Sequence, residues 1–448
     1  MKNDSAAFKK QQKKSNNVNQ VNNDIIYPTK IGIVFFRKIA MQAHQSSTKW
    51  YLLALILLTD IVVIAMPTMA MSVLSNEITH DLNLSVVQVG IVWGIGSLPT
   101  ILTSLLGGSL GDKFGPKKMM IFSTIIIAGL GAARGLVPNY GWLLVIAALF
   151  GAFLPFVFIN GIKIIGQWFP DSQLGVANGF VTMAMALGFF LGSIISASVL
   201  SPWLNGWRHV FVFYGVIGVF ICIPWIFTRA APMPQSASSK SGSISKSIRH
   251  VFRMKNVWMI ALVMFSMSGA IQGVMGYLPL YLREIGWSGI KADGALSVLN
   301  LVSMAFVLPI AIWSDRLGSR KKIMVAGAIA AILGIGLLGI MKGNWIWGAV
   351  VLAGFMRDGF MAMLLTSIIE TEGIGHVYAG TAMGIINGMG GLGMSLEPAL
   401  GNSLAGIGAG APFFLWAGSA LAAMVLVFFL KGKRKKVVNS VEIESALA

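Results

Sequence analysis

Apolar residues gather along the chain into twelve long runs that are separated by short polar segments. Each run holds about 20 residues with few charges, which is the length that an α-helix needs to cross the hydrocarbon core of a membrane. The pattern predicts an all-α membrane protein with twelve transmembrane helices, near residues 50–73, 86–107, 119–138, 141–165, 175–199, 209–229, 257–281, 293–313, 322–342, 345–369, 379–405 and 411–430.

The longest polar connection divides the chain into two parts with six predicted helices each. This connection is rich in serine and lysine and holds no acidic residue, which is typical of a flexible linker. In the polar tail before the first helix, residues 31–43 are too short to span and suit an amphipathic helix on the membrane surface. The predicted domains are an N-terminal tail (1–49), an N-terminal six-helix bundle (50–229), a linker (230–256), a C-terminal six-helix bundle (257–430) and a C-terminal tail (431–448).

The composition agrees with a chain that lies mostly in lipid. Hydrophobic residues make up 56% of the 448 and charged residues only 11%, whereas soluble domains carry about a quarter charged residues. These values exclude a soluble globular protein, a disordered chain and a coiled coil. The single cysteine, Cys222, excludes an intramolecular disulfide and a cysteine metal cluster.

The basic residues follow the predicted topology. Of the 34, 28 fall on the side of the membrane that carries both tails and the linker, and five fall in turns on the other side. Because cytoplasmic segments carry an excess of lysine and arginine, we predict a protein of the cytoplasmic cell membrane with both termini in the cytoplasm. The net charge of +18 then reflects orientation and contact with anionic membrane lipid, so nucleic acid is not a predicted partner.

The two predicted bundles repeat each other in sequence. The turn at 107–120 matches the turn at 308–324 at an offset of 203, and Gly175–Gly179 matches Gly380–Gly384 at an offset of 205. Duplicated six-helix halves with a ligand site between them are an architecture of transporters. In the first match Asp112 aligns with Asp315, Gly115 with Gly318, and Lys117–Lys118 with Arg320–Lys321.

The first of these turns resembles a motif of a known family. The run G-x-L-x-D-x-x-G-x-x-K at Gly108–Lys118 is similar to the loop between helices 2 and 3 in the major facilitator superfamily, and 311–321 is a degenerate copy. The resemblance implies twelve helices in two halves and a cytoplasmic latch that favours one conformation. The alternative is a turn with a purely topological role. The latch residues that it implies are Gly108, Asp112, Gly115, Lys117, Asp315, Arg316, Gly318 and Arg320.

Three shorter sequence motifs resemble a narrower group within this family. Gln167-Trp-Phe-Pro, followed by Gly175-Val-Ala-Asn-Gly179 and Gly206-Trp-Arg208, is similar to bacterial carriers of small organic or inorganic anions. Two departures accompany it. The arginine that many proton-coupled members carry early in helix 4 is Ala147 here, and 186–192 lacks the Gly-Pro pair of drug/proton antiporters.

Charged residues inside predicted spans are few and mark candidate sites, because each costs about 2.5–3.5 kcal/mol on insertion scales. Arg357 is the predicted anion-binding group, helped by Lys163, and the neutral Asn160 and Gln272 are further candidates for substrate contact. The alternatives are a Lys163 that snorkels to the headgroups and amides that bond between helices. Asp60, Asp358 and Glu397 are the predicted proton carriers, with a structural ion pair as the alternative.

Together these features predict a secondary transporter that works by alternating access and moves a small organic anion with protons. The predicted partners are a small-molecule solute, protons and lipid, and the predicted state is a monomer with no cofactor. The five histidines lie in tails or turns and no nucleotide-binding loop occurs, so neither an enzyme nor an ATP-driven pump is predicted. Efflux of drug-like compounds and a transporter-like sensor that no longer cycles are the alternatives.

Overall fold

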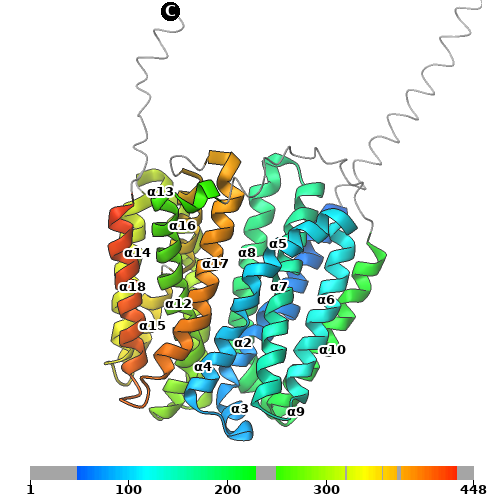
Figure 1. The fold of residues 1–448 in the computed structure, drawn as a ribbon. Coiled ribbons are helices and arrows are strands. Elements are labelled where there is room, and N and C mark those ends of the chain that lie inside the picture. Colours follow the sequence, from blue (N-terminus) through cyan, green and yellow to red (C-terminus); the bar gives the residue numbers. More distant parts are fainter. Residues whose placement is uncertain (1–47, 229–248, 318–319, 356, 371–374, 431–448) are drawn as a thin grey trace, which may run out of the picture. The chain divides into compact units, whose positions relative to one another are not determined.

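The computed structural model describes residues 48–228, 249–317, 320–355, 357–370 and 375–430. Every regular element in these ranges is a helix (Figure 1). Residues 48–54 belong to a helical N-terminal unit, and the residues from Leu55 onward form one compact unit. The predicted tails, residues 31–43 and most of the predicted linker lie outside the described ranges.

Helices of the first half (55–228) and of the second half (249–430) gather on different sides of this unit (Figure 1). The first half contains two π-helical segments, η1 and η3, and one short 3-10 segment, η2. Its elements are η1 (Asp60–Ala65), α2 (Met66–Val73), α3 (Ser75–Leu82), α4 (Val86–Ile95), α5 (Ser97–Phe114), α6 (Pro116–Ala133), η2 (Arg134–Leu136), α7 (Tyr140–Trp168), α8 (Asp171–Ile195), η3 (Ser196–Leu200), α9 (Ser201–Leu204) and α10 (Trp207–Phe227).

The second half has longer, less interrupted helices. Its elements are α12 (Lys255–Glu284), α13 (Gly289–Leu317), α14 (Arg320–Leu338), α15 (Trp345–Phe355), α16 (Arg357–Glu370), α17 (Gly375–Asn402) and α18 (Ala411–Phe429). Within this half α12 packs on α17 and α18, and across the halves α17 packs on α4 and α5 while α13 packs on α8.

The prediction of an all-helical membrane protein is confirmed by ten helices that are long and apolar enough to cross a membrane. They correspond to ten of the twelve predicted spans. The other two, 345–369 and 379–405, coincide with α15 and α16 and with α17. Ten candidate membrane helices are found among the described residues, so the number of twelve transmembrane helices stays a prediction.

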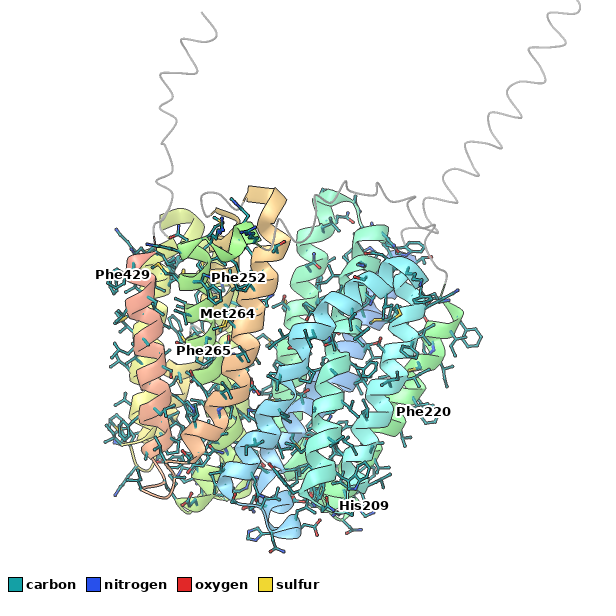
Figure 2. The ribbon with its side chains drawn as sticks, viewed as in Figure 1. His209, Phe220, Phe252, Met264, Phe265 and Phe429 are labelled. Carbon is teal, nitrogen blue, oxygen red and sulfur yellow. The ribbon has the colours of Figure 1, made fainter. Side chains whose placement is uncertain are left out.

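Large apolar side chains cover the outside of the helices. Phe220 on α10 is 63% exposed and Phe429 at the end of α18 is 67% exposed, and both point away from the helix packing (Figure 2). An apolar outer surface of this kind suits a hydrocarbon environment, because lipid imposes no cost on exposed apolar groups. The buried side chains form separate apolar cores, one of which lies wholly in the second half.

The turn at Gly115 shows why the repeated motif needs its glycine. Helix α5 ends at Phe114 and α6 begins at Pro116, so one residue reverses the chain. Gly115 has φ +91° and ψ 138°, which residues with a Cβ rarely adopt. Pro116 stands at the first position of the new helix, where its missing N–H is not needed.

In each half, a lysine just after the repeated turn bonds to the end of the last helix of that half. The Lys117 ammonium donates to the carbonyls of Ile226 and Thr228 at the end of α10. The Lys321 ammonium donates to the carbonyls of Phe428 (2.5 Å) and Leu430 (3.3 Å) at the end of α18. Lysine at a helix C-terminus satisfies orphan carbonyls and matches the helix dipole. By contacts, Lys117 thus corresponds to Lys321, one residue beyond the Arg320 that sequence alignment pairs with it.

Candidate functional site: a cavity between the two halves

A cavity of about 510 Å³ lies between the two halves. From the first half it is bordered by α2, α4, α5, α7, α8 and residues of η1 and η2, and from the second by α12, α16 and α17. Two glycines let its walls meet, because a Cβ on Gly151 of α7 would lie only 1.9 Å from the Gly96 carbonyl oxygen between α4 and α5. The volume falls within the roughly 300–1,000 Å³ of small-molecule sites.

Arg134 provides a buried cation from the first half. Helix α6 ends at Ala133, and the short η2 turns the chain so that the side chain borders the cavity. Arg134 is only 3% exposed, and its guanidinium lies 3.7 Å from the ring centroid of Phe150 and 5.0 Å from that of Phe211. Its Nη1 makes one long hydrogen bond of 3.5 Å to the Pro67 carbonyl. Nε and Nη2 find no hydrogen-bond partner among the described residues.

Arg357 provides the second cation, from α16, and it is already paired. Its Nη2 lies 2.9 Å from Asp358 Oδ2 and its Nε 3.0 Å from Asp358 Oδ1. Its Nη1 donates to Asn300 Oδ1 at 2.6 Å. Asp358 also accepts a 2.6 Å hydrogen bond from the Ser303 hydroxyl of α13. Both Arg357 and Asp358 border the cavity.

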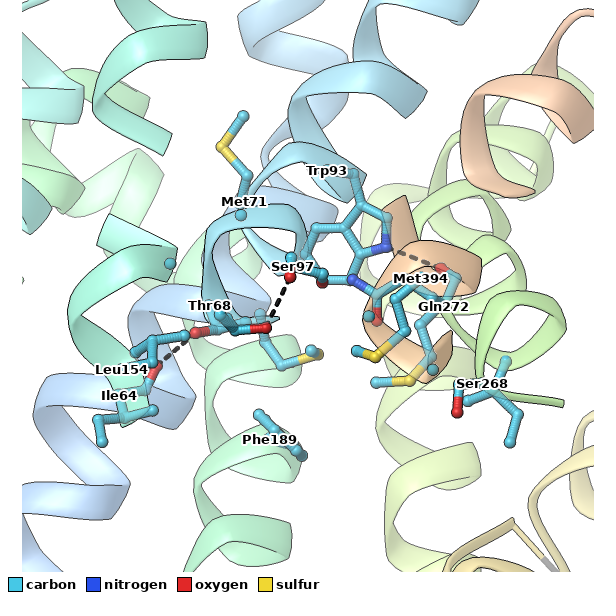
Figure 3. Close-up of a pocket in the computed structure, with 18 of the residues that line it drawn as sticks. Ile64, Thr68, Met71, Trp93, Ser97, Leu154, Phe189, Ser268, Gln272 and Met394 are labelled. Carbon is cyan, nitrogen blue, oxygen red and sulfur yellow. Dashed lines mark hydrogen bonds between the residues drawn. The ribbon is translucent and has the colours of Figure 1, made fainter. Parts of the chain in front are cut away.

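Three of the neutral polar side chains that border the cavity already donate hydrogen bonds to the chain itself. The Thr68 hydroxyl donates to the Ile64 carbonyl and that of Thr100 to the Ser97 carbonyl, each at 2.6 Å. Trp93 of α4 meets Gln272 of α12, where its indole Nε1 donates to the Gln272 carbonyl at 2.7 Å (Figure 3). The Gln272 side chain and that of Asn387 border the cavity.

A set of hydrogen bonds joins the halves on one side of this cavity. We call the end of the helices at the Gly115 turn the basic end and the opposite end the outer end. The joining bonds lie in the outer half of the helices and constitute the outer closure. They link Ser72 to the Met275 carbonyl (2.5 Å), Trp93 to the Gln272 carbonyl, Ser193 to Ser297 (2.9 Å), Ser198 to Asp293 (3.0 Å) and Asn402 to the Val86 carbonyl (2.8 Å).

The other two predicted substrate contacts lie elsewhere, beside the repeated turn. The Lys163 ammonium lies 2.5 Å from Asp112 Oδ1 and donates to the Gly108 carbonyl at 2.6 Å. Asn160 donates to the Gly107 carbonyl at 3.3 Å, and a Cβ on Gly111 would collide with its amide oxygen. Neither Asn160 nor Lys163 borders the cavity. Their contacts tie α7 to the end of α5, close to the motif.

Two of the predicted proton carriers are buried away from the cavity lining. Asp60 begins η1 in the middle of the first span and is 2% exposed; π-helical turns of this kind often occur at functional sites. Glu397 of α17 is 4% exposed, and its Oε2 finds no hydrogen-bond partner among the described residues. Glu397 packs so tightly against Gly269 of α12 that a Cβ there would lie 2.5 Å from its carboxyl carbon.

The second copy of the motif is described only in its backbone. Asp315 and Arg316 lie near the end of α13 and Arg320 begins α14, but their side chains, and the whole of Gly318, lie outside the described residues. The latch role predicted for them stays a prediction. No cluster of three or more histidine, cysteine or acidic side chains that could hold a metal occurs in the described part of the chain.

Sequence reasoning missed two buried charges. Arg134 is one of the five basic residues in the predicted turns of the outer side, and an arginine there runs against the charge bias, which is a signal that could have singled it out. Asp293 stands at the start of a predicted span, where a charge looks solvated. In the structure it is 1% exposed and bonds Arg283 at 2.6 Å as well as Ser198.

Two helical halves around one cavity, with a cation from each half, are an arrangement typical of membrane carriers whose ligand site lies between the halves. The sequence agrees with this class. The model of the Major Facilitator Superfamily matches residues 56–396 and 301–446. The chain belongs to this family, as the motif at Gly108–Lys118 predicted.

Several transporters are about a quarter identical to this chain over the residues that align. A probable galactarate/D-glucarate transporter of Bacillus subtilis, GudP, is 27% identical over 207 residues, which cover 44% of each chain. The sialic acid transporter NanX of Escherichia coli is 23% identical over 380 residues, 80% of this chain and 88% of NanX. The multi-drug resistance efflux pump PmrA of Streptococcus pneumoniae is 24% identical over 54% of this chain and 61% of PmrA. For GudP and PmrA the match thus spans about half of the relative's length.

A solved structure shows the same fold. The crystal structure of a bacterial homologue of the human lysosomal transporter Spinster, in an inward-facing conformation, superposes with a TM-score of 0.66 at 17% sequence identity. The superposition covers 86% of this chain and 95% of the other.

Proposed function

We propose that the protein is a secondary transporter that carries a small organic anion across the cytoplasmic membrane by alternating access. The observation that carries this proposal is the pair of buried arginines, Arg134 and Arg357, one from each half, on one cavity. A buried guanidinium without a full set of partners attracts a carboxylate or sulfonate, which it can bind through two parallel hydrogen bonds. Anion carriers among the relatives support the same substrate class.

The outer closure supports one step of the transport cycle. The hydrogen bonds between the halves on the outer side of the cavity support a state that is closed toward the outer end. The basic end carries Lys113, Lys117 and Lys118 of the turn, and the positive-inside bias places that end in the cytoplasm. We therefore assign this conformation to a cytoplasm-facing state.

The pairing of Arg357 with Asp358 offers a route to proton coupling. While Asp358 is charged, it competes with a substrate anion for the Arg357 guanidinium. A proton on Asp358 removes that competition and frees Arg357, so that anion and proton bind together. Asp60 and Glu397 remain further proposed proton sites, since each is a buried carboxyl group in a span.

Uptake into proteoliposomes tests this coupling. We expect uptake of a labelled monocarboxylate by the native chain to rise when the pH outside the vesicles is lower than the pH inside. Asp358→Asn is expected to take up the anion without that stimulation. Arg357→Gln is expected to lose uptake, whereas Lys342→Gln, which removes one charge from an exposed turn, keeps it. Uptake by the native chain that ignores the gradient would refute proton coupling. A gradient response that persists in Asp358→Asn would move the coupling site to Asp60 or Glu397.

Efflux of drug-like compounds is the second candidate. Seven methionines border the cavity, and flexible thioether side chains adapt to varied apolar ligands. The similarity to the efflux pump PmrA also favours drug efflux. Cationic dyes separate the two candidates: a drug exporter binds and expels them, whereas a cavity built around two arginines repels them.

A further inference from the structure

The cavity has one positive charge that its own walls do not neutralise. Asp358 holds Arg357 through two hydrogen bonds and so compensates that charge. No carboxylate pairs with Arg134 among the described residues, and Nε and Nη2 of its guanidinium have no hydrogen-bond partner. Asp60 and Glu397 do not border the cavity. While Asp358 is charged, a ligand with one negative charge therefore balances the site, and a dianion is balanced only when Asp358 carries a proton.

Apolar groups dominate the remaining wall. Besides seven methionines, the rings of Trp93, Phe150 and Phe189 border the space. The hydroxyl groups of Thr68 and Thr100 donate to their own helices, and the indole N–H of Trp93 donates to the Gln272 carbonyl. The donors left for a ligand are the guanidinium of Arg134, the side-chain amides of Gln272 and Asn387, and the hydroxyls of Ser97 and Ser268.

We propose that the ligand of this cavity is a monoanion with a compact apolar body, such as an aromatic or branched-chain monocarboxylate. This inference rests on the anion transport proposed above and narrows its substrate class. A polyhydroxylated sugar acid fits less well, because methionine and aromatic side chains outnumber the polar groups that could bond its hydroxyls. An apolar body instead gains by leaving water, and methionine sulfur packs favourably against an aromatic ring.

The geometry gives the two parts of the ligand different places. The carboxylate lies at Arg134, whose guanidinium carbon is 3.7 Å from the Phe150 ring centroid and whose Nε and Nη2 have no hydrogen-bond partner among the described residues. The apolar body extends toward Phe189 and the methionines, among them Met361 and Met394 of the second half. Contacts to both halves are what a substrate needs in order to couple its binding to their movement.

Thermal unfolding of the purified full chain with a panel of matched ligands tests the inference, since a ligand that binds the folded state raises the midpoint. The panel holds phenylacetate and 4-methylpentanoate, the sugar acids galactonate and galactarate, and the neutral phenethyl alcohol. We expect phenylacetate to bind at least about tenfold more tightly than galactonate, equivalent to about 1.4 kcal/mol. Met361→Gln replaces an apolar side chain of the cavity wall by a polar one of similar length. We expect this variant to bind phenylacetate more weakly and galactonate as tightly as the native chain does.

The possible outcomes separate this inference from the proposed function. If galactonate or galactarate binds more tightly than phenylacetate, the apolar substrate class is refuted while anion transport stands. Equal binding of phenethyl alcohol and phenylacetate would also refute the inference, because the charge would then contribute nothing. If no anion in the panel binds, both the inference and the anion carrier are overturned.

Discussion

Cross-linking position 193 to position 297 is expected to stop transport completely and reversibly. The hydroxyl oxygens of Ser193 on α8 and Ser297 on α13 lie 2.9 Å apart and are buried in the outer closure. Cysteines at these two positions would place their thiols next to each other, as formation of a disulfide requires. A bond there fixes the two halves together at the outer end, and alternating access requires that end to open in every cycle.

The measurement is uptake by the variant Ser193→Cys/Ser297→Cys after mild oxidation and again after reduction. The native chain suits it, because its single cysteine, Cys222, is buried in α10 and distant in sequence from both positions. Each single variant serves as a control and should transport under both conditions. Normal uptake by the oxidised double variant, with the disulfide verified by mass, would mean that this interface does not open during transport.

Replacing Arg134 by glutamine is expected to weaken binding of a monocarboxylate about 30-fold or more, since losing one partner of a buried charge pair costs about 2–5 kcal/mol. Arg134→Lys keeps the charge but loses the guanidinium contact with the Phe150 ring, so its affinity should fall between those of the native chain and Arg134→Gln. Binding is measured by titration calorimetry of the purified protein, and monodisperse gel filtration confirms that the variants fold.

Lys342→Gln removes one positive charge from an exposed turn and is expected to bind as the native chain does. Arg134→Gln that binds within twofold of the native chain would show that Arg357 alone holds the anion. The comparison with Arg357→Gln then assigns the site. If both single variants bind normally, the ligand does not use this cavity.

The positions of the helices could be predicted from the sequence because apolar runs of membrane length are a direct physical signal. The turn at Gly115 was also predictable, since a positive φ at that point requires glycine. Arg357, Asp358 and Gln272 were predicted as site residues and border one cavity. Charge inside an apolar span was the signal for the first two.

What the sequence could not supply was the direction and partner of a side chain. Lys163 lies in a span as Arg357 does, yet it bonds Asp112, which is 51 residues away in the chain. Arg134 looks like a turn residue until η2 bends the chain and brings it to the cavity beside Phe150. The pairing of Asp293 with Ser198 joins two halves whose contacts depend on the packing of α13 on α8. Such contacts between distant segments are a property of the folded chain.

Counterflow in proteoliposomes tests the central claim most directly, because it needs neither a coupling ion nor a known direction of transport. Vesicles loaded with unlabelled phenylacetate are diluted into a trace of the labelled acid. Alternating access by one saturable site predicts a transient accumulation of label above equilibrium, absent in Arg134→Gln and in the oxidised cross-linked variant. Label that only equilibrates, in vesicles whose protein binds phenylacetate, would contradict a carrier with one alternately exposed anion site.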